Sequence, residues 1–197
     1  SNTEIPIIIA VDLNFPYIRK QLKEMGLANV YDSDFIFSKL DLNLKSCSYV
    51  TWSETKLKQY QFWTELKKEL QAADTPLKVQ KVRPQHWTNL AVGKTGVHLA
   101  ATFNTQEERV SAQLYIVRDK AMFKALESKK EEIEKAIGEK LSWQLLPEKA
   151  ASRIALYRPN SDIENNDDWK EMLKWLIEKL EKLRAVFSPR LKNLNLE

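Results

Sequence analysis

The sequence lacks the features that would cross-link the chain by disulfides or insert it into a membrane. Its 197 residues include a single cysteine, Cys47, so an intrachain disulfide is excluded. The longest apolar run, residues 7–11, is far shorter than the ~20 residues that a transmembrane helix needs. The N-terminus has no succession of basic, apolar and small residues of the kind found in signal peptides. We therefore expect a protein of the reducing cytoplasm with no membrane contact.

Patterns that would hold a metal ion are also missing. The three residues with ligand chemistry, Cys47, His86 and His98, are far apart in the sequence and have no paired spacing of the zinc-site type. We therefore expect no metal ion and no cofactor.

The segment Gly93-Lys94-Thr95-Gly96 has the last residues of a phosphate-binding P-loop but not the first. That motif requires a glycine five residues before the Gly-Lys-Thr triplet, and Thr88 occupies the position. The residues that follow, 97–104, alternate in polarity like a strand rather than starting a helix. We therefore interpret 93–96 as the loop of a β-hairpin, with Lys94 at its tip.

Carboxylates are absent from two segments, although the whole chain has 27 Asp and Glu against 31 Lys and Arg. None lies between Asp74 and Glu107, and none lies between Glu181 and Glu197. The net charge of +4 is modest, so the location of the positive charge is more informative than its size. Basic segments without counter-charges are candidate contacts to anions.

The polarity pattern predicts an α+β fold with a mainly antiparallel sheet over residues 53–192, followed by a short tail at 193–197. A three-strand meander is expected first, with two further strands and helices packed on the sheet. The expected elements are a helix at 53–71 with Ser53 as N-cap, strands at 87–92, 97–104 and 109–117, a helix at 120–137, strands at 141–147 and 152–158, and a helix from 169 that ends at Ser188-Pro189. Residues 1–52 predict a small β-α-β-like unit, or the remnant of an upstream domain.

Alternation in the third strand separates a core face from an open face. Val110, Ala112, Leu114 and Ile116 point one way, whereas Ser111, Gln113 and Tyr115 point the other. Two interpretations of Trp87, Tyr115 and Tyr157 stay open: a platform for stacking bases, if they lie on an open sheet face, or ordinary core packing. The tryptophans of the helices, Trp63, Trp169 and Trp175, are expected in the core.

Several stretches of this chain together resemble a prokaryotic family, the domain of unknown function numbered 4268. The stretches are YQFWTELKKEL, LAVGKTGVHLAATFNTQEERVSAQLYI, DKAMFKAL, EEIEKAIGEKLSWQLLPEKAASRIALYR and DWKEMLKWLIEKLEKLRAVFSPRLK, in that order between residues 53 and 192. No catalytic activity is assigned to this family, so the resemblance gives no activity to expect for this chain. It implies a place beside a restriction-like nuclease domain, upstream or separate, and so a role in DNA metabolism or defence.

The leading hypothesis is a non-catalytic accessory module that contacts nucleic acid through basic loops. The motive is the carboxylate-free basic segment beside the hairpin loop, together with the implied nuclease association. The candidate contact residues are Lys78, Lys81, Arg83, Lys94, Arg109, Arg153 and Arg158.

Two alternatives stay open at the level of the sequence. Trp175 and Ile177 lie off the apolar stripe of the last helix, and an exposed patch there would make the chain a protein-interaction or dimerisation module. Asp41, Glu54 and Lys56 have the spacing of a metal-dependent nuclease pattern, in which an Asp is followed by Glu-x-Lys. The expected position of Glu54 in the first turn of a helix, however, already explains that residue. A second Glu-x-Lys match, residues 127–129, is expected in mid-helix.

Overall fold

Five antiparallel strands form one sheet in the spatial order β1-β2-β3-β5-β4. The computed structural model describes residues 53–79 and 81–194. Its strands are β1 (Trp87–Ala91), β2 (Val97–Asn104), β3 (Arg109–Ile116), β4 (Ser142–Gln144) and β5 (Ser152–Arg158). The predicted meander and the α+β class are confirmed. The two further strands join the sheet through the pairing of β5 with β3. The β-α-β-like unit predicted for residues 1–52 lies outside the described residues.

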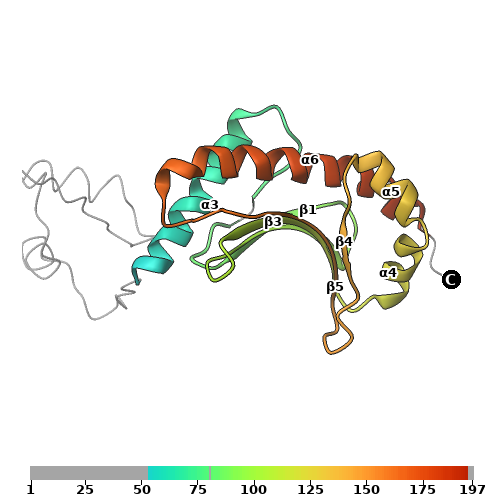
Figure 1. The fold of residues 1–197 in the computed structure, drawn as a ribbon. Coiled ribbons are helices and arrows are strands. Elements are labelled where there is room, and N and C mark those ends of the chain that lie inside the picture. Colours follow the sequence, from blue (N-terminus) through green and yellow to red (C-terminus); the bar gives the residue numbers. More distant parts are fainter. Residues whose placement is uncertain (1–52, 80, 195–197) are drawn as a thin grey trace, which may run out of the picture. The chain divides into compact units, whose positions relative to one another are not determined.

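The helices gather on one face and at the ends of the sheet (Figure 1). They are α3 (Glu54–Ala72), α4 (Lys120–Glu127), α5 (Lys130–Ile137) and α6 (Trp169–Asn193), with a short 3-10 turn η2 (Asn166–Asp168) before α6. The long helix α6 runs over the sheet and contacts β2 and β3, α3 packs beside it, and α4 and α5 lie towards the β4–β5 end. Within the described residues, no helix is long and apolar enough to cross a membrane.

The core forms where one face of the sheet meets α6. The inward residues of β3, from Val110 to Ile116, are fully buried, as their alternation predicts. The apolar stripe of α6 lies against them, with Leu176, Leu180 and Leu183 each 0% exposed. Burial of these two complementary apolar surfaces is the main stabilising term of the fold.

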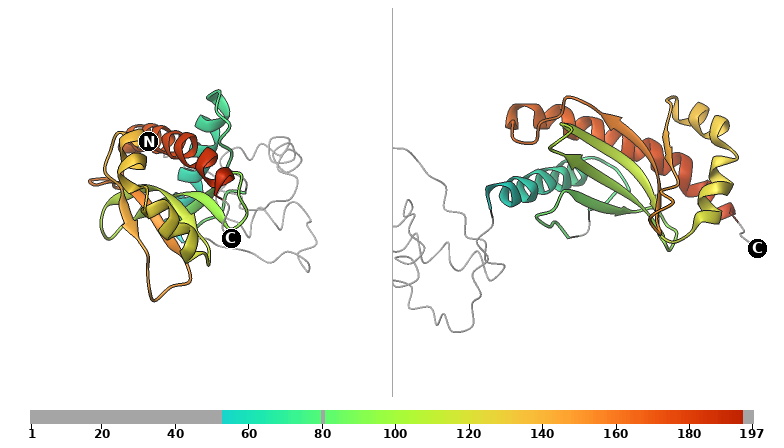
Figure 2. Two further views of the ribbon diagram at one scale, coloured as in Figure 1. Left: turned by 90° about the vertical axis from the view of Figure 1, so that its right-hand side faces the viewer. Right: turned by 60° about the horizontal axis from the view of Figure 1, so that its bottom comes forward.

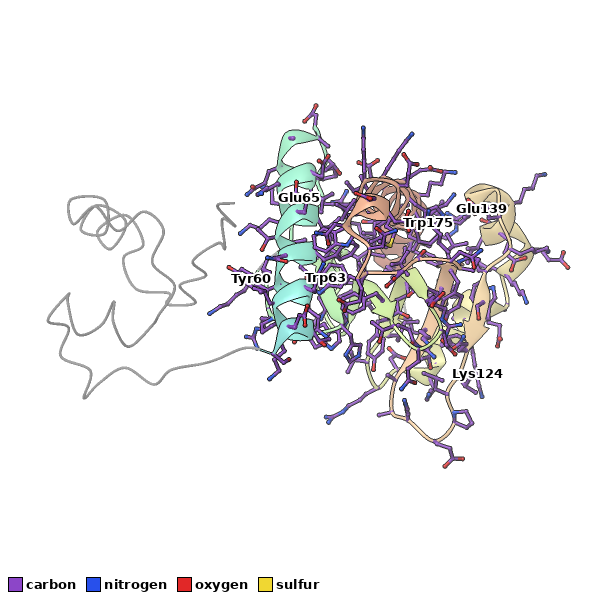
Figure 3. All side chains as sticks on the ribbon, turned by 60° about the vertical axis from the view of Figure 1, so that its left-hand side comes forward. Tyr60, Trp63, Glu65, Lys124, Glu139 and Trp175 are labelled. Atoms are coloured by element: carbon purple, nitrogen blue, oxygen red, sulfur yellow. The ribbon has the colours of Figure 1, made fainter. Side chains whose placement is uncertain are left out.

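The first described helix, α3, joins this core through its aromatic residues. Ser53 caps the helix, because its side chain accepts a hydrogen bond from the Lys56 amide. Trp63 faces the strands and Tyr60 faces away from them, as Figure 3 shows. The Trp63 ring stacks on Phe103 of β2 with a centroid distance of 5.4 Å, which attaches α3 to the sheet.

The single helix predicted for residues 120–137 is wrong, because the chain forms two helices that meet at Ser128 and Lys129. The Ser128 hydroxyl donates to the carbonyl of Ala125, a local bond that competes with helix continuation. The two halves also pack on different surfaces, α4 on β3 and β5 and α5 on α6. The Glu-x-Lys match at residues 127–129 therefore lies at a helix junction rather than in mid-helix.

The predicted stop of the last helix at Ser188-Pro189 is also wrong, since α6 continues to Asn193 with Pro189 inside it. Proline removes one helical hydrogen bond and usually ends or kinks a helix. Here Phe187 and Leu191, on either side of the proline, are both 0% exposed, so their burial holds the last turns in helical conformation. The Arg190 guanidinium also donates to the carbonyl of Val186, so a side chain adds a hydrogen bond close to the position where Pro189 lacks one.

Candidate nucleic-acid interface

The face of the sheet opposite α6 carries a broad groove of about 860 Å³. In the right-hand view of Figure 2, where the lower side of Figure 1 comes forward, the strands lie in front of α6. The lining is polar and aromatic, and no Asp or Glu of the described residues belongs to it. It consists of Gln59, His86, Trp87, Asn89, His98, Ala100, Thr102, Phe103, Asn104, Thr105, Gln106, Arg109, Ser111, Gln113, Tyr115, Arg153 and Tyr157.

The strand register arranges the groove floor in three long rows that cross the sheet, followed by the pair Asn104 and Arg109. Directly opposed residues of antiparallel strands lie on the same face, so each row is given by the pairing. The first row is Ala91, His98, Tyr115, Arg153 and Gln144; the second is Asn89, Ala100, Gln113, Ala155 and Ser142; the third is Trp87, Thr102, Ser111 and Tyr157. Aromatic rings therefore lie in the first and third rows, and the row between them has none.

Arg153 is held in place by a neighbour on the edge strand. Its Nε donates to Oε1 of Gln144, and the Gln144 amide nitrogen donates to the Tyr157 hydroxyl at 3.1 Å. A further bond at 2.8 Å joins that nitrogen to the Ser142 hydroxyl. Within the described parts of the chain, no carboxylate pairs with Arg153. The guanidinium is thus oriented by a neutral amide and not by a carboxylate of the described residues.

Arg109 lies on the same side of the groove but is partly neutralised. Its guanidinium carbon lies 4.3 Å from the centroid of the Tyr157 ring, in cation–π geometry. Its Nη2 also forms an ion pair with Glu107 at 2.5 Å. Of the two arginines, Arg153 is therefore the stronger candidate for an anionic ligand.

His98 and Tyr115 stack on each other across β2 and β3, with centroids 5.1 Å apart and ring planes 28° apart. Burial lowers the pKa of His98 below its usual value, because desolvation disfavours the imidazolium. The ring is therefore neutral at pH 7 and adds aromatic surface and hydrogen-bonding nitrogens, not charge, to the groove.

The middle of the floor holds a polar side chain between two small residues. Gln113 is 5% exposed and lies between Ala100 and Ala155 in the second row. Its Oε1 is buried and has no hydrogen-bond partner among the described residues. Next to it, the Thr102 and Ser111 hydroxyls bond to each other at 2.6 Å. A buried carbonyl oxygen without a donor is unusual in a folded chain.

Of the seven predicted contact residues, the structure brings two together in the groove, Arg109 and Arg153. Arg158 pairs with Val110 on the helix-covered face, and its guanidinium donates to the Ser161 hydroxyl at 2.7 Å. The remaining four lie outside the groove lining. Lys78, Lys81 and Arg83 are exposed on the connection between α3 and β1, and Lys94 is in the β1–β2 loop.

The β1–β2 loop is a hairpin loop, as predicted, and not a phosphate-binding loop. Gly93 and Gly96 have φ angles of +86° and +78°, which L side chains rarely adopt. A Cβ atom on Gly93 would lie 4.0 Å from the Ser188 hydroxyl oxygen. The loop therefore approaches α6, and the two carboxylate-free segments of the sequence meet at this point.

The structure describes most of the residues behind the two alternative hypotheses. Trp175 and Ile177 are half-buried and packed against the core, so the expected exposed patch is absent from this part of α6. Glu54 and Lys56 are exposed in the first turn of α3, and Asp41 lies outside the described residues. In the ranges 53–79 and 81–194, no three His, Cys, Asp or Glu side chains are placed to hold a metal ion.

Sequence reasoning missed Gln144, the residue that orients Arg153 and Tyr157. The alternation of the short segment Ser142-Trp143-Gln144 places its first and last residues on one face. That signal alone does not identify the neighbours, since β4 follows β3 in the chain but pairs with β5 in the sheet. Trp87, Tyr115 and Tyr157, by contrast, do lie on the open face on which a stacking platform depends.

The position of β4 depends on a buried carboxylate in α5. One oxygen of Glu134 accepts hydrogen bonds from the Leu141 amide and the Trp143 indole, each at 3.1 Å. The other oxygen forms an ion pair with Lys140 at 2.8 Å. The bond with Lys140 is the main cause that lowers the pKa of Glu134 to about 2; the other two donors add to it and burial opposes it.

We expect a Glu134→Gln variant to be less stable than the parent at pH 7, with a difference that shrinks in acid. A carboxyl pKa of about 2 in the folded chain, against 4.5 when unperturbed, stabilises the fold above pH 4.5. That stabilisation is lost as the pH falls from 4.5 towards 2. Melting temperatures of both proteins between pH 7 and pH 2.5 measure the effect. A difference that stays constant over this range would contradict the ion-pair account.

Comparison with known proteins identifies a family but no activity. The model of a domain of unknown function, DUF4268, matches residues 58–191. No curated protein matches the chain. Among solved structures, a chain in the "Structure of the HopA1-SchA Chaperone-Effector Complex" is similar at 12% identity and a TM-score of 0.32, over 66% of this chain and 99% of that one. A likeness of this score carries no inference about function.

Proposed function

This chain belongs to the DUF4268 family, a domain of unknown function, and we propose that it is a non-catalytic accessory module that contacts nucleic acid through the open face of its sheet. The groove lining supports this proposal. It combines two arginines with aromatic rings and neutral hydrogen-bonding side chains, and no carboxylate of the described residues lines it. The association with a nuclease or defence system rests on the family resemblance alone.

The chemistry of the groove matches what nucleic acid requires of a protein surface. Phosphates are bound by Arg and Lys, with an affinity that falls as the salt concentration rises, because the counterions released on binding then gain less entropy. Bases stack on aromatic side chains and on guanidinium planes. Trp87, at 38% exposure, is one of the most exposed large apolar side chains of the described chain, and it faces this groove. An exposed tryptophan in the same groove as two arginines is available for stacking on a ligand.

The basic loops have a secondary role in this proposal. Lys78, Lys81 and Arg83 are exposed and do not line the groove. Solvated lysines of this kind add long-range attraction for a polyanion without forming a site of their own.

Fluorescence-anisotropy titrations with labelled single-stranded and duplex DNA at several salt concentrations test the proposal. We expect salt-dependent binding by the parent protein. Replacing Arg153 by Gln should weaken binding and lower the log–log salt slope by about 0.7 for a single strand or 0.9 for a duplex. The triple change Lys81→Gln, Arg83→Gln and Lys94→Gln should lower the affinity. The binding that remains should still depend on the residues of the groove.

Two results would contradict the proposal. Absence of binding by the parent protein even at low salt would reject nucleic acid as the ligand. Binding that is abolished by the triple loop variant but unchanged by Arg153→Gln would move the contact from the groove to the loops. Circular dichroism of each variant, compared with the parent, establishes that the fold is retained.

A further inference from the structure

The two walls of the groove have different chemistry. Every formally charged lining residue lies on the β3–β5 side, namely Arg109 and Arg153. The β1–β2 side has no Lys, Arg, Asp or Glu among its lining residues. It offers Trp87, Asn89, His98, Thr102, Asn104 and, from the adjoining segment, His86. One wall therefore suits an anion, and the other suits neutral aromatic faces and hydrogen-bonding edges.

The charged wall is organised before any ligand arrives. Gln144 bonds both Arg153 and Tyr157, and Arg109 covers the Tyr157 ring, so four side chains form a connected set along β3, β5 and β4. The Gln144 amide holds only the Nε of Arg153, and the terminal Nη groups have no carboxylate partner among the described residues. A guanidinium fixed in this way loses little conformational entropy when it binds phosphate.

The neutral wall carries an exposed ring and a carboxamide on the same strand. Trp87 lies at the end of the third row, on edge strand β1, opposite Thr102. Asn89, two residues along the same strand and on the same face, has a carboxamide that both donates and accepts hydrogen bonds. Stacking on a ring and bonding to an adjacent amide is the way in which proteins hold unpaired bases.

From this asymmetry we infer that the groove binds single-stranded nucleic acid, with its phosphates along the β3–β5 wall and its bases towards β1 and β2. A single strand carries charge along one edge and bases along the other, which matches the two walls. A duplex exposes phosphates on both sides and keeps its bases paired, so the neutral wall would face a second row of charge without a cation. The inference deepens the proposed function and depends on it.

Three probes separate the two walls. They are a fluorescein-labelled single-stranded DNA oligonucleotide of mixed sequence, an abasic strand of the same length, and the same sequence as a duplex. The abasic strand keeps every phosphate and lacks the bases. We expect the parent protein to bind the single strand at least tenfold more tightly than the duplex. Loss of the bases should cost roughly fivefold to a hundredfold, the range for one or more stacked bases.

Two variants should respond in opposite ways. Arg153→Gln should lower the salt slope for the single strand by about 0.7 and leave the ratio between normal and abasic strands unchanged. Trp87→Ala should leave the salt slope unchanged and bring that ratio close to one. Lys124→Gln is the matched control for charge, since Lys124 is exposed on α4 and outside the groove. It should change neither quantity beyond a small non-specific loss of affinity.

The outcomes distinguish failure of this inference from failure of the proposed function. Equal binding of single strand and duplex, or of normal and abasic strands, would overturn the single-strand inference while leaving nucleic-acid binding in place. So would a Trp87→Ala variant that alters the salt slope and not the abasic ratio. If the parent protein binds none of the three probes at low salt, both proposals fail together.

Discussion

Replacing Trp63 by alanine is expected to lower the free energy of unfolding by about 3–5 kcal/mol, the range for truncating a large buried aromatic side chain. Trp63 is 0% exposed and contacts the aromatic core on two sides. Its ring stacks on Phe103 of β2 and meets Phe62 edge-on at 5.0 Å. The indole N–H donates to the Gln85 carbonyl at 2.7 Å, just before β1. The change therefore removes packing and also leaves a carbonyl without its donor.

Urea unfolding, followed by circular dichroism, measures this loss. Gln61→Ala is the matched control, because Gln61 is exposed on the same helix, and its effect should stay within about 0.5 kcal/mol. Trp63→Phe separates the two contributions, since phenylalanine keeps an aromatic ring in the core and lacks the indole donor. A Trp63→Ala variant as stable as the Gln61→Ala control would show that α3 is not attached to the sheet as described.

The second large effect is expected at Lys120, at the start of α4. Its ammonium, which has three hydrogens to donate, lies within hydrogen-bond distance of the carbonyls of Leu145, Leu146 and Ala151 and of the Ser152 hydroxyl. These acceptors lie on both sides of the β4–β5 connection, so one side chain closes that loop. Hydrogen bonds from a charged donor are among the stronger ones in proteins, and a Lys120→Met variant should lose about 2 kcal/mol of stability.

Because the same loop joins β4 to β5, the Lys120→Met change should also loosen the Gln144–Arg153 contact. Amide hydrogen exchange should become faster between residues 145 and 152 than in β2 and β3. Lys124→Met is the control, since Lys124 points outward from α4 in Figure 3 and is exposed. Equal stability of the Lys120 and Lys124 variants would contradict the proposed role of the ammonium.

Local pattern was sufficient for most helices and strands of the described chain. The strand from 109 to 116 and the strand from 152 to 158 were predictable because alternate residues must enter an apolar core. The hairpin loop at 93–96 was predictable because two glycines allow positive φ angles. The two errors, at Ser128 and at Pro189, have a common cause. In both places, packing against distant elements outweighs the local signal, ending a helix in one case and continuing it in the other.

The candidate site was less predictable than the fold. Two of the seven proposed contact residues, Arg109 and Arg153, line the groove, and both come from strands rather than from the basic loops that motivated the prediction. Charge density along the chain identifies segments rich in Lys and Arg, but it does not identify which of them face one another. Gln144 has no charge and no motif, so no pattern in the sequence separates it from other surface glutamines.

The amino-acid sequence by itself determined which residues alternate along the strands and where a carboxylate-free stretch occurs, because these properties can be read over a few neighbouring positions. Only the tertiary structure decided that Arg153, Gln144, Tyr157 and Arg109 form one wall and that Trp87 lies on the other. The physical reason is the pairing of β5 with both β3 and β4, in an order that the chain does not follow. Strand order and register are set by the fit of the whole apolar face against α6, a long-range property that no short segment contains.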